Sequence, residues 1–135
     1  MASIFTQIVQ GEVSAYKIAE TDKYLAFLDV SPVVRGHTLV IPKEEVATLW
    51  DLDEETYLGL QVFTRLVARA IRAAIPCMRV AEAVIGLEVP HAHIHLFPVN
   101  TLSDFNFSQP RVKLSETEFK GIADEIARHL DEMVA

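Results

Sequence analysis

The stretch that decides the fold is His91-Ala92-His93-Ile94-His95-Leu96-Phe97, in which a histidine occupies every second position. Side chains on a β-strand alternate between the two faces of a sheet, so the pattern predicts a strand with three imidazoles on one face. The intervening Ala92, Ile94 and Leu96 would then point into a core. Three of the chain's five histidines lie in this segment, and buried imidazoles each need a hydrogen-bond partner. The segment therefore marks the chemical site.

Helix and strand patterns extend to both sides of this segment. We expect a short helix over 3–10, a hairpin of strands over 15–20 and 23–30, a strand over 37–41, and a further strand over 78–86. Two longer amphipathic helices are expected, one from the cap Asp53 to Pro76 and one from the capping box Ser115/Glu118 to about Met133. Consecutive strands with two substantial helices predict an α+β domain with an antiparallel sheet, one long central helix and a C-terminal helix. The helices should cover one sheet face and leave the other for a ligand or partner.

Composition limits the classes of protein and partner. The 135 residues, half of them hydrophobic, suit a single domain over 1–135. The net charge of −7 argues against long nucleic acids and anionic membranes as partners. No stretch is long enough to span a bilayer. The single cysteine, Cys77, suits a reducing compartment, and the start shows no secretory signal, so we expect a cytoplasmic protein.

The histidine row supports two chemical interpretations. A neutral imidazole, best placed at His93, can attack phosphorus and form a phospho-histidine intermediate that water later resolves. Alternatively, the imidazoles could bind zinc. Histidines at i and i+4 on one strand are about 13 Å apart, so the outer pair cannot converge on one ion, although two neighbours with a ligand from elsewhere could. We expect no metal and no cofactor.

The chain resembles the histidine triad superfamily, whose signature is His-φ-His-φ-His-φ-φ with φ apolar. The segment 36–43, Gly-His-Thr-Leu-Val-Ile-Pro-Lys, is similar to the family's GHxLVxPK strand, which carries a fourth active-site histidine. The segment 24–30 resembles the strand that forms the nucleoside pocket. This resemblance covers roughly residues 3–99, in the family's order throughout.

The resemblance implies a hydrolase or transferase that cleaves nucleotides at the α-phosphate and forms homodimers. His93 would be the nucleophile and His95 would hydrogen-bond a non-bridging oxygen, while His91 and His37 would hold the imidazoles in working tautomers. The nucleotide-binding residues would be Asp29, on the ribose hydroxyls, and the apolar walls Phe27, Val30 and Ile8 around the base. The physical setting of Asp29, at the end of an apolar strand before a Pro-containing loop, also suits either two vicinal hydroxyls or simply the opening of the turn.

The sequence also departs from the family pattern. The family's phosphate-binding Gln and Ser/Thr before the triad are replaced by Leu87 and Glu88. Leu87 donates no hydrogen bond. Glu88, which holds one of the nucleotide-binding positions, either faces away or pairs with an imidazole and raises its pKa. Ser3 and Thr6 stand where some relatives carry a zinc-binding Cys-x-x-Cys, so that site is absent.

We therefore predict a nucleotide phosphohydrolase that acts on a nucleoside phosphoramidate or dinucleotide-type substrate through a nucleotidyl-His93 intermediate. Two alternatives stay open. One is a nucleotide-binding or regulatory module with vestigial hydrolysis, which the changes at Leu87 and Glu88 favour, and the other is a zinc-dependent hydrolase. Of the remaining histidines, His129 is expected to be an ordinary surface residue.

Overall fold

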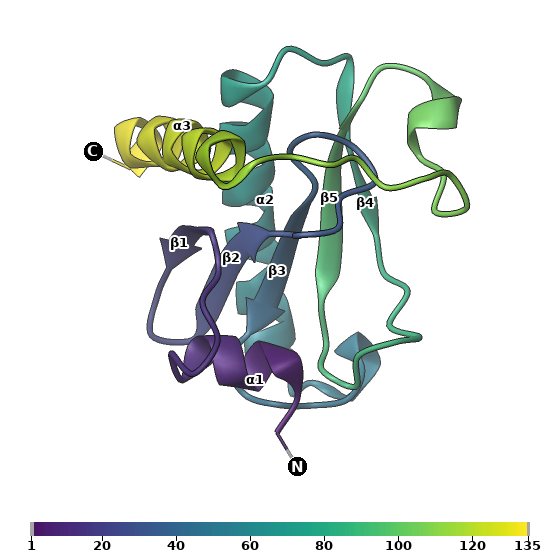
Figure 1. Ribbon diagram of the computed structural model, residues 1–135. Helices are drawn as coiled ribbons and strands as arrows, with labels where there is room; N and C mark the ends of the chain where they lie inside the picture. The colour runs from purple at the N-terminus through teal and green to yellow at the C-terminus, as the bar shows by residue number, and fades with distance from the viewer. Residues whose placement is uncertain (1, 135) are drawn as a thin grey trace.

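A five-stranded antiparallel sheet forms the centre of the computed structural model, which describes residues 2–134 (Figure 1). The strands follow the order β1-β2-β3-β5-β4: β1 (Lys17–Glu20), β2 (Tyr24–Leu28), β3 (Thr38–Pro42), β5 (Ile94–Val99) and β4 (Arg79–Ala83). The helices are α1 (Ile4–Val9), α2 (Glu54–Ala74) and α3 (Glu116–Val134), with two short 3-10 turns, η1 (Leu49–Asp51) and η2 (Leu102–Asp104). This arrangement confirms the predicted α+β class.

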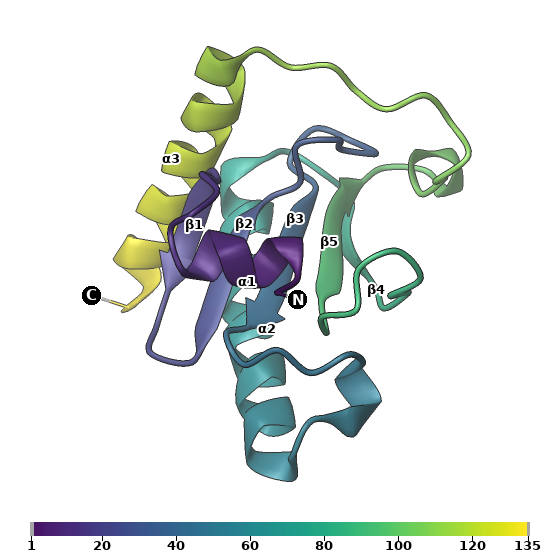
Figure 2. The same ribbon diagram turned by 60° about the horizontal axis from the view of Figure 1, so that its bottom comes forward.

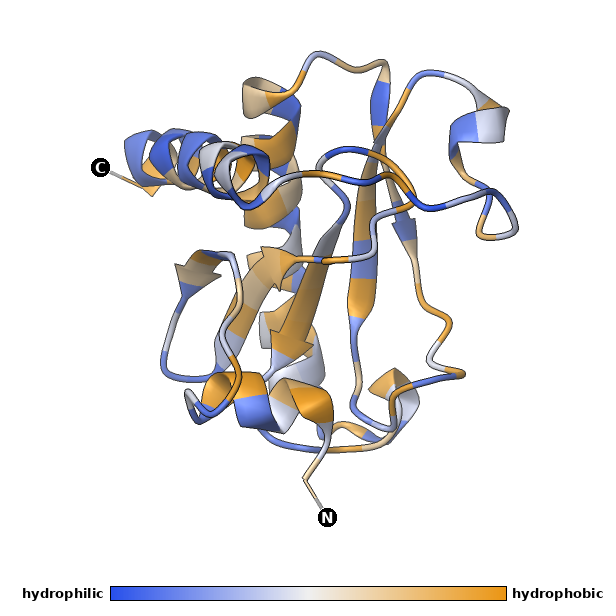
Figure 3. Ribbon diagram, viewed as in Figure 1, coloured by the Kyte–Doolittle hydropathy of each residue, from blue (hydrophilic) through white to orange (hydrophobic). Residues whose placement is uncertain are grey.

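Strand alternation divides the apolar side chains between two cores. The larger core lies between the sheet and the helices α2 and α3, and it contains the predicted inward-facing residues Ala92, Ile94 and Leu96. A smaller core lies on the opposite face, where α1 covers part of the sheet (Figures 1 and 2). Both faces of β2 and β3 are therefore buried, and their ribbons are largely hydrophobic, whereas much of α3 is hydrophilic (Figure 3). The two long helices cover one face as expected, and the short helix α1 closes part of the face that was expected to be left for a ligand or partner.

The predicted capping residues begin the helices as expected. The Ser3 hydroxyl accepts a hydrogen bond from the Thr6 amide at 3.0 Å, and the Asp53 carboxylate accepts one from the Thr56 amide at 2.7 Å. Ser115 and Glu118 form the predicted reciprocal pair at the start of α3. These contacts satisfy amides that the first helical turn leaves without partners.

The histidine strand is shorter than its alternating pattern predicts. β5 begins at Ile94, so His91 and His93 lie in the segment before it. The backbone there hydrogen-bonds outside the sheet: the His91 amide donates to Val89 O at 2.9 Å, and the Ala92 amide donates to Val46 O at 2.7 Å. The strand predicted over 78–86 likewise ends early, at Ala83.

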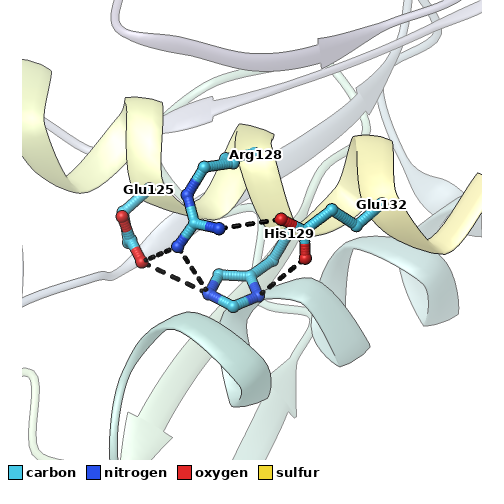
Figure 4. Close-up of polar contacts among 4 residues, drawn as sticks. All are labelled: Glu125, Arg128, His129 and Glu132. Atoms are coloured by element: carbon cyan, nitrogen blue, oxygen red, sulfur yellow. Dashed lines mark hydrogen bonds and ion pairs between the residues drawn. The ribbon is translucent and has the colours of Figure 1, made fainter.

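The last histidine lies apart from the other four, on α3. Its imidazole is placed between Glu125 and Glu132, and Arg128 bridges the same two carboxylates (Figure 4). His129 thus belongs to a surface charge network, as predicted. Among residues 2–134, no helix has the length and apolar character that crossing a membrane requires.

Candidate active site

Four histidines gather on the sheet face that α1 leaves partly open. His37 precedes β3, His91 and His93 precede β5, and His95 lies within β5. All four are buried, yet their rings remain close to one another: the centroids of His93 and His95 are 5.0 Å apart, and those of His37 and His95 are 5.2 Å apart. Phe5 of α1 meets His91 and His93 edge-on, at 5.7 and 5.1 Å between centroids. The fold therefore brings the predicted cluster together.

The hydrogen bond of His93 fixes which nitrogen is reactive. Its Nδ1 lies 2.7 Å from the carbonyl oxygen of His91. A carbonyl oxygen only accepts, so Nδ1 carries the proton and donates it. In the neutral ring, Nε2 then holds the free lone pair. The His93 side chain also lines a cavity, which is described below.

A two-histidine relay fixes the tautomer of His95. The Val33 amide donates to Nδ1 of His37 at 3.1 Å, so the proton of the neutral His37 ring is on Nε2. That Nε2 lies 2.9 Å from Nδ1 of His95 and donates to it. The proton of His95 is consequently on Nε2, and the His95 side chain lines the same cavity as His93. His93 and His95 thus offer an adjacent lone pair and N–H.

His91 is held by a polar network at the start of α1. Its Nε2 donates to the carbonyl oxygen of Pro42 at 2.8 Å, and its Nδ1 accepts from the Ser3 hydroxyl at 2.9 Å. Glu45 Oε1 accepts from the Thr6 hydroxyl at 2.6 Å and from the Ser3 amide at 2.7 Å. These hydrogen bonds lower the pKa of Glu45 to about 2. The network fastens α1 to the segment that carries His93.

Burial keeps the supporting imidazoles neutral. It lowers the pKa of His37 to about 3, with His95 adding to the shift, and it lowers the pKa of His95 to about 4, with His93 adding. The pKa of His91 is also lowered by burial, against its hydrogen bond to Pro42. The hydrogen-bond relay therefore persists at neutral pH.

A cavity of about 450 Å³ opens beside these rings. Its lining combines apolar side chains with a small set of polar groups, as is typical of small-molecule sites: Phe5, Asp29, Leu39, Ile85, Gly86, Leu87, Glu88, Val89, His93, His95, Phe107 and Arg111. Larger grooves lie elsewhere on the surface, but the described histidines line none of them.

Two of the five predicted nucleotide-binding residues line the cavity, and three do not. Asp29 and Glu88 line the cavity, and burial raises the pKa of Asp29 against the hydrogen bond from the Ser31 amide. Ile8 and Phe27 lie in the smaller core beneath Phe5 and do not line it. Val30 is 67% exposed and borders a different groove, beside α3.

Sequence reasoning missed several cavity residues, among them Phe5, Phe107 and Arg111. Phe5 lies on α1, where the sequence predicted only a short helix. Phe107 and Arg111 lie in the irregular segment after β5, where no periodicity indicates which side chains turn inward. The Phe107 ring lies 5.5 Å from that of His95, so this segment closes one side of the site.

Asp29, His37 and His95 are close enough to suggest a metal site, with ligand atoms within 4.8 Å of one another. The hydrogen bonds argue against it. The lone pair of neutral His37 is on Nδ1, which accepts from the Val33 amide, and its Nε2 proton points at His95. A metal ligand needs a free lone pair on the facing nitrogen, so the residues present do not fit a metal ion.

Comparison with known proteins agrees with this geometry. Residues 10–102 match the HIT domain family. The chain is 33% identical over 129 residues to adenosine 5'-monophosphoramidase hnt1 of Schizosaccharomyces pombe. This alignment covers 94% of this chain and 97% of the relative. Adenosine 5'-monophosphoramidase HNT1 of Saccharomyces cerevisiae is 33% identical over 98 residues, covering 72% of this chain and 62% of the relative.

Solved structures show the same fold. A histidine triad nucleotide-binding protein of Sulfolobus tokodaii superposes with a TM-score of 0.86 at 26% identity, over 96% of this chain and 93% of the other. A zinc-bound histidine triad protein of Mycobacterium smegmatis superposes with a TM-score of 0.81 at 27% identity, over 99% and 96%. The chain therefore belongs to the histidine triad (HIT) family, which confirms the resemblance inferred from its motifs.

Proposed function

We propose that this protein hydrolyses a nucleoside phosphoramidate or dinucleotide-type substrate at its α-phosphate, with His93 as the nucleophile. The observation that carries the proposal is the hydrogen bond from His93 Nδ1 to its own backbone segment, which leaves Nε2 unprotonated beside the Nε2–H of His95. The names of the two yeast relatives, both adenosine 5'-monophosphoramidases, support the same class of activity.

The reaction proceeds in two displacements at phosphorus. Nε2 of His93 attacks the α-phosphorus, the bond to the leaving nitrogen or oxygen breaks, and the leaving group takes up a proton from solvent. His95 donates its Nε2–H to a non-bridging oxygen, where negative charge develops. Water then attacks phosphorus in the nucleotidyl-His93 intermediate and loses a proton to solvent. The P–Nε2 bond breaks, which releases the nucleoside monophosphate and restores neutral His93.

The other predicted residues position these groups and the nucleoside. His37 and His91 act through hydrogen bonds to hold His95 and the His93 segment. The Asp29 carboxylate faces the cavity and accepts from the ribose hydroxyls. Leu87 and Glu88 border the same cavity without offering a side-chain cation or neutral donor to a phosphate. A charged Glu88 repels a polyphosphate leaving group, so we propose that the phosphoramidate is the better substrate.

A single substitution tests the assignment of the nucleophile. His93→Ala should lower kcat on adenosine 5'-phosphoramidate by about a thousandfold or more, because covalent catalysis loses its only attacking atom. His129→Ala is the matched control, since that imidazole lies on α3 away from the cavity. Binding of AMP without turnover by the wild-type protein would instead support a nucleotide-binding module.

The unpaired edge of β4 supports the proposed homodimer. β4 pairs with β5 on one side only. Exposed apolar side chains flank β4 in the chain and also lie on α2, which packs against β4: Met78, Val84 and Ile85, and Leu58 and Val62. Open strand edges beside apolar surface favour pairing with another chain. We propose that two copies join through this edge, and that the enzyme acts in the cytoplasm.

A further inference from the structure

Arg111 lies at the cavity although it follows the HIT-domain match, which ends at residue 102. The chain between η2 and α3 crosses in front of β5 in Figure 1 and brings this residue to the site. Arg111 Nη1 donates to Ser31 O at 2.7 Å, and its Cζ lies 5.3 Å from the centre of the Phe107 ring. The next amide, that of Val112, donates to Pro32 O at 2.9 Å. The guanidinium is therefore anchored, not free in solvent.

Arg111 supplies the positive charge that the other residues lining the cavity lack. Among the lining residues, Arg111 is the one lysine or arginine, whereas Asp29 and Glu88 are carboxylic acids. His95 and its partner His37 are neutral at pH 7. The chain as a whole carries a net charge of −7, so its overall field does not attract an anion. A phosphate entering this cavity finds permanent positive charge at one side chain.

Arg111 also has donors left for a ligand. One nitrogen, Nη1, donates to Ser31, and within the described residues Nη2 and Nε have no protein acceptor. A guanidinium presents its N–H groups in a planar fork that matches two phosphate oxygens. Stacking on Phe107 and the bond to Ser31 hold that fork in place, which reduces the entropy lost on binding.

We propose that Arg111 is the phosphate-binding residue of this protein, and that it takes over the role the family gives to the Gln and Ser/Thr replaced here by Leu87 and Glu88. The proposal rests on the proposed function for the placement of the α-phosphate beside His93. It goes further by naming the anion-binding group and placing it in the segment after β5. Discrimination of nucleotides from nucleosides would then depend on a residue outside the triad motif.

The test compares AMP with adenosine by calorimetric titration of the full chain. Arg111→Met should weaken AMP binding by about tenfold or more, because a charge-assisted hydrogen-bonded pair is lost. Adenosine binding should change by less than about twofold. Arg111→Lys keeps the charge without the fork and should give an intermediate loss for AMP. Arg128→Met is the matched control, since that exposed arginine lies on α3.

The outcomes separate this proposal from the hydrolase proposal. Equal weakening of AMP and adenosine by Arg111→Met would show a merely structural role and overturn the proposal, as would unchanged AMP binding or a wild-type protein that binds both ligands equally. If Arg111→Met does not fold, Arg111→Lys decides by the same ratio of AMP to adenosine affinity. A wild-type protein that prefers AMP through Arg111 but turns over no substrate would refute the hydrolase proposal alone.

Discussion

Mild acid should destabilise the folded protein through its buried histidines. An unfolded histidine has a pKa of about 6.5, whereas the pKa values of His37 and His95 in the fold are lowered to about 3 and about 4. At pH values between the unfolded-state pKa and these folded-state pKa values, the unfolded chain binds protons that the folded protein does not, so the free energy of unfolding falls as the pH falls. Each histidine contributes about 1.4 kcal/mol per pH unit.

The size of the loss follows from these values. From pH 6.5 to pH 4.5, two histidines over two units give about 4 to 5 kcal/mol, which is comparable with the whole stability of many domains. His91, whose pKa is lowered by burial, adds to the loss, and Asp29, whose pKa is raised by burial, offsets part of it. The loss continues below pH 4.5 until the pH has fallen through the folded-state pKa values, about 4 for His95 and about 3 for His37.

Urea unfolding at half-unit steps from pH 7 to pH 4.5 measures this slope. The matched variant is His37→Gln, whose amide can still accept from the Val33 amide and donate to His95 but cannot titrate. We expect the slope to fall by about half in this variant. A free energy of unfolding that changes by less than about 1 kcal/mol in the wild-type protein over this range would refute the account of buried neutral histidines.

Three further predictions concern other parts of the molecule. Ser3→Ala should lower the free energy of unfolding by about 1–3 kcal/mol in urea, because it removes the α1 cap and leaves Nδ1 of His91 without its main donor; an unchanged midpoint would contradict this. Glu88→Gln should raise kcat/KM for a dinucleoside polyphosphate relative to a phosphoramidate by about threefold or more, and an unaltered ratio would remove Glu88 from leaving-group selection. Val62→Lys should convert a particle of twice the chain mass into a monomer in light scattering, since it places a charge in an apolar contact; a wild-type monomer would contradict the proposed dimer.

The sequence predicted the parts of this fold that depend on local periodicity and capping. Alternation at 91–97 correctly divided the imidazoles from Ala92, Ile94 and Leu96. Ser3, Asp53 and Ser115 began their helices as their side-chain chemistry requires. The backbone pairing between strands was less predictable. The alternation continues through His91 and His93, but the backbone amides of this segment hydrogen-bond to Val89 and Val46 and not to a neighbouring strand.

The site was predictable where one short motif carries the chemistry, and less so where the chain folds back on itself. The tautomers of His93 and His95 depend on a carbonyl and on His37, and the second of these contacts joins residues 58 positions apart. Arg111 reaches the cavity through an irregular segment that has no period to indicate which side faces inward. Val30 follows an apolar strand, yet the chain turns there and leaves the side chain exposed on another groove.

Trapping the covalent intermediate tests the central claim most directly. The wild-type protein would be mixed with adenosine 5'-phosphoramidate, quenched in base within one turnover, and digested for peptide mass spectrometry, because histidine phosphoramidates survive base better than acid. We predict a nucleotidyl group on His93, which is absent from His93→Ala and present in His129→Ala. A burst of product without an adduct on any peptide, or an adduct on His91 or His95, would contradict the assignment of His93 as the nucleophile.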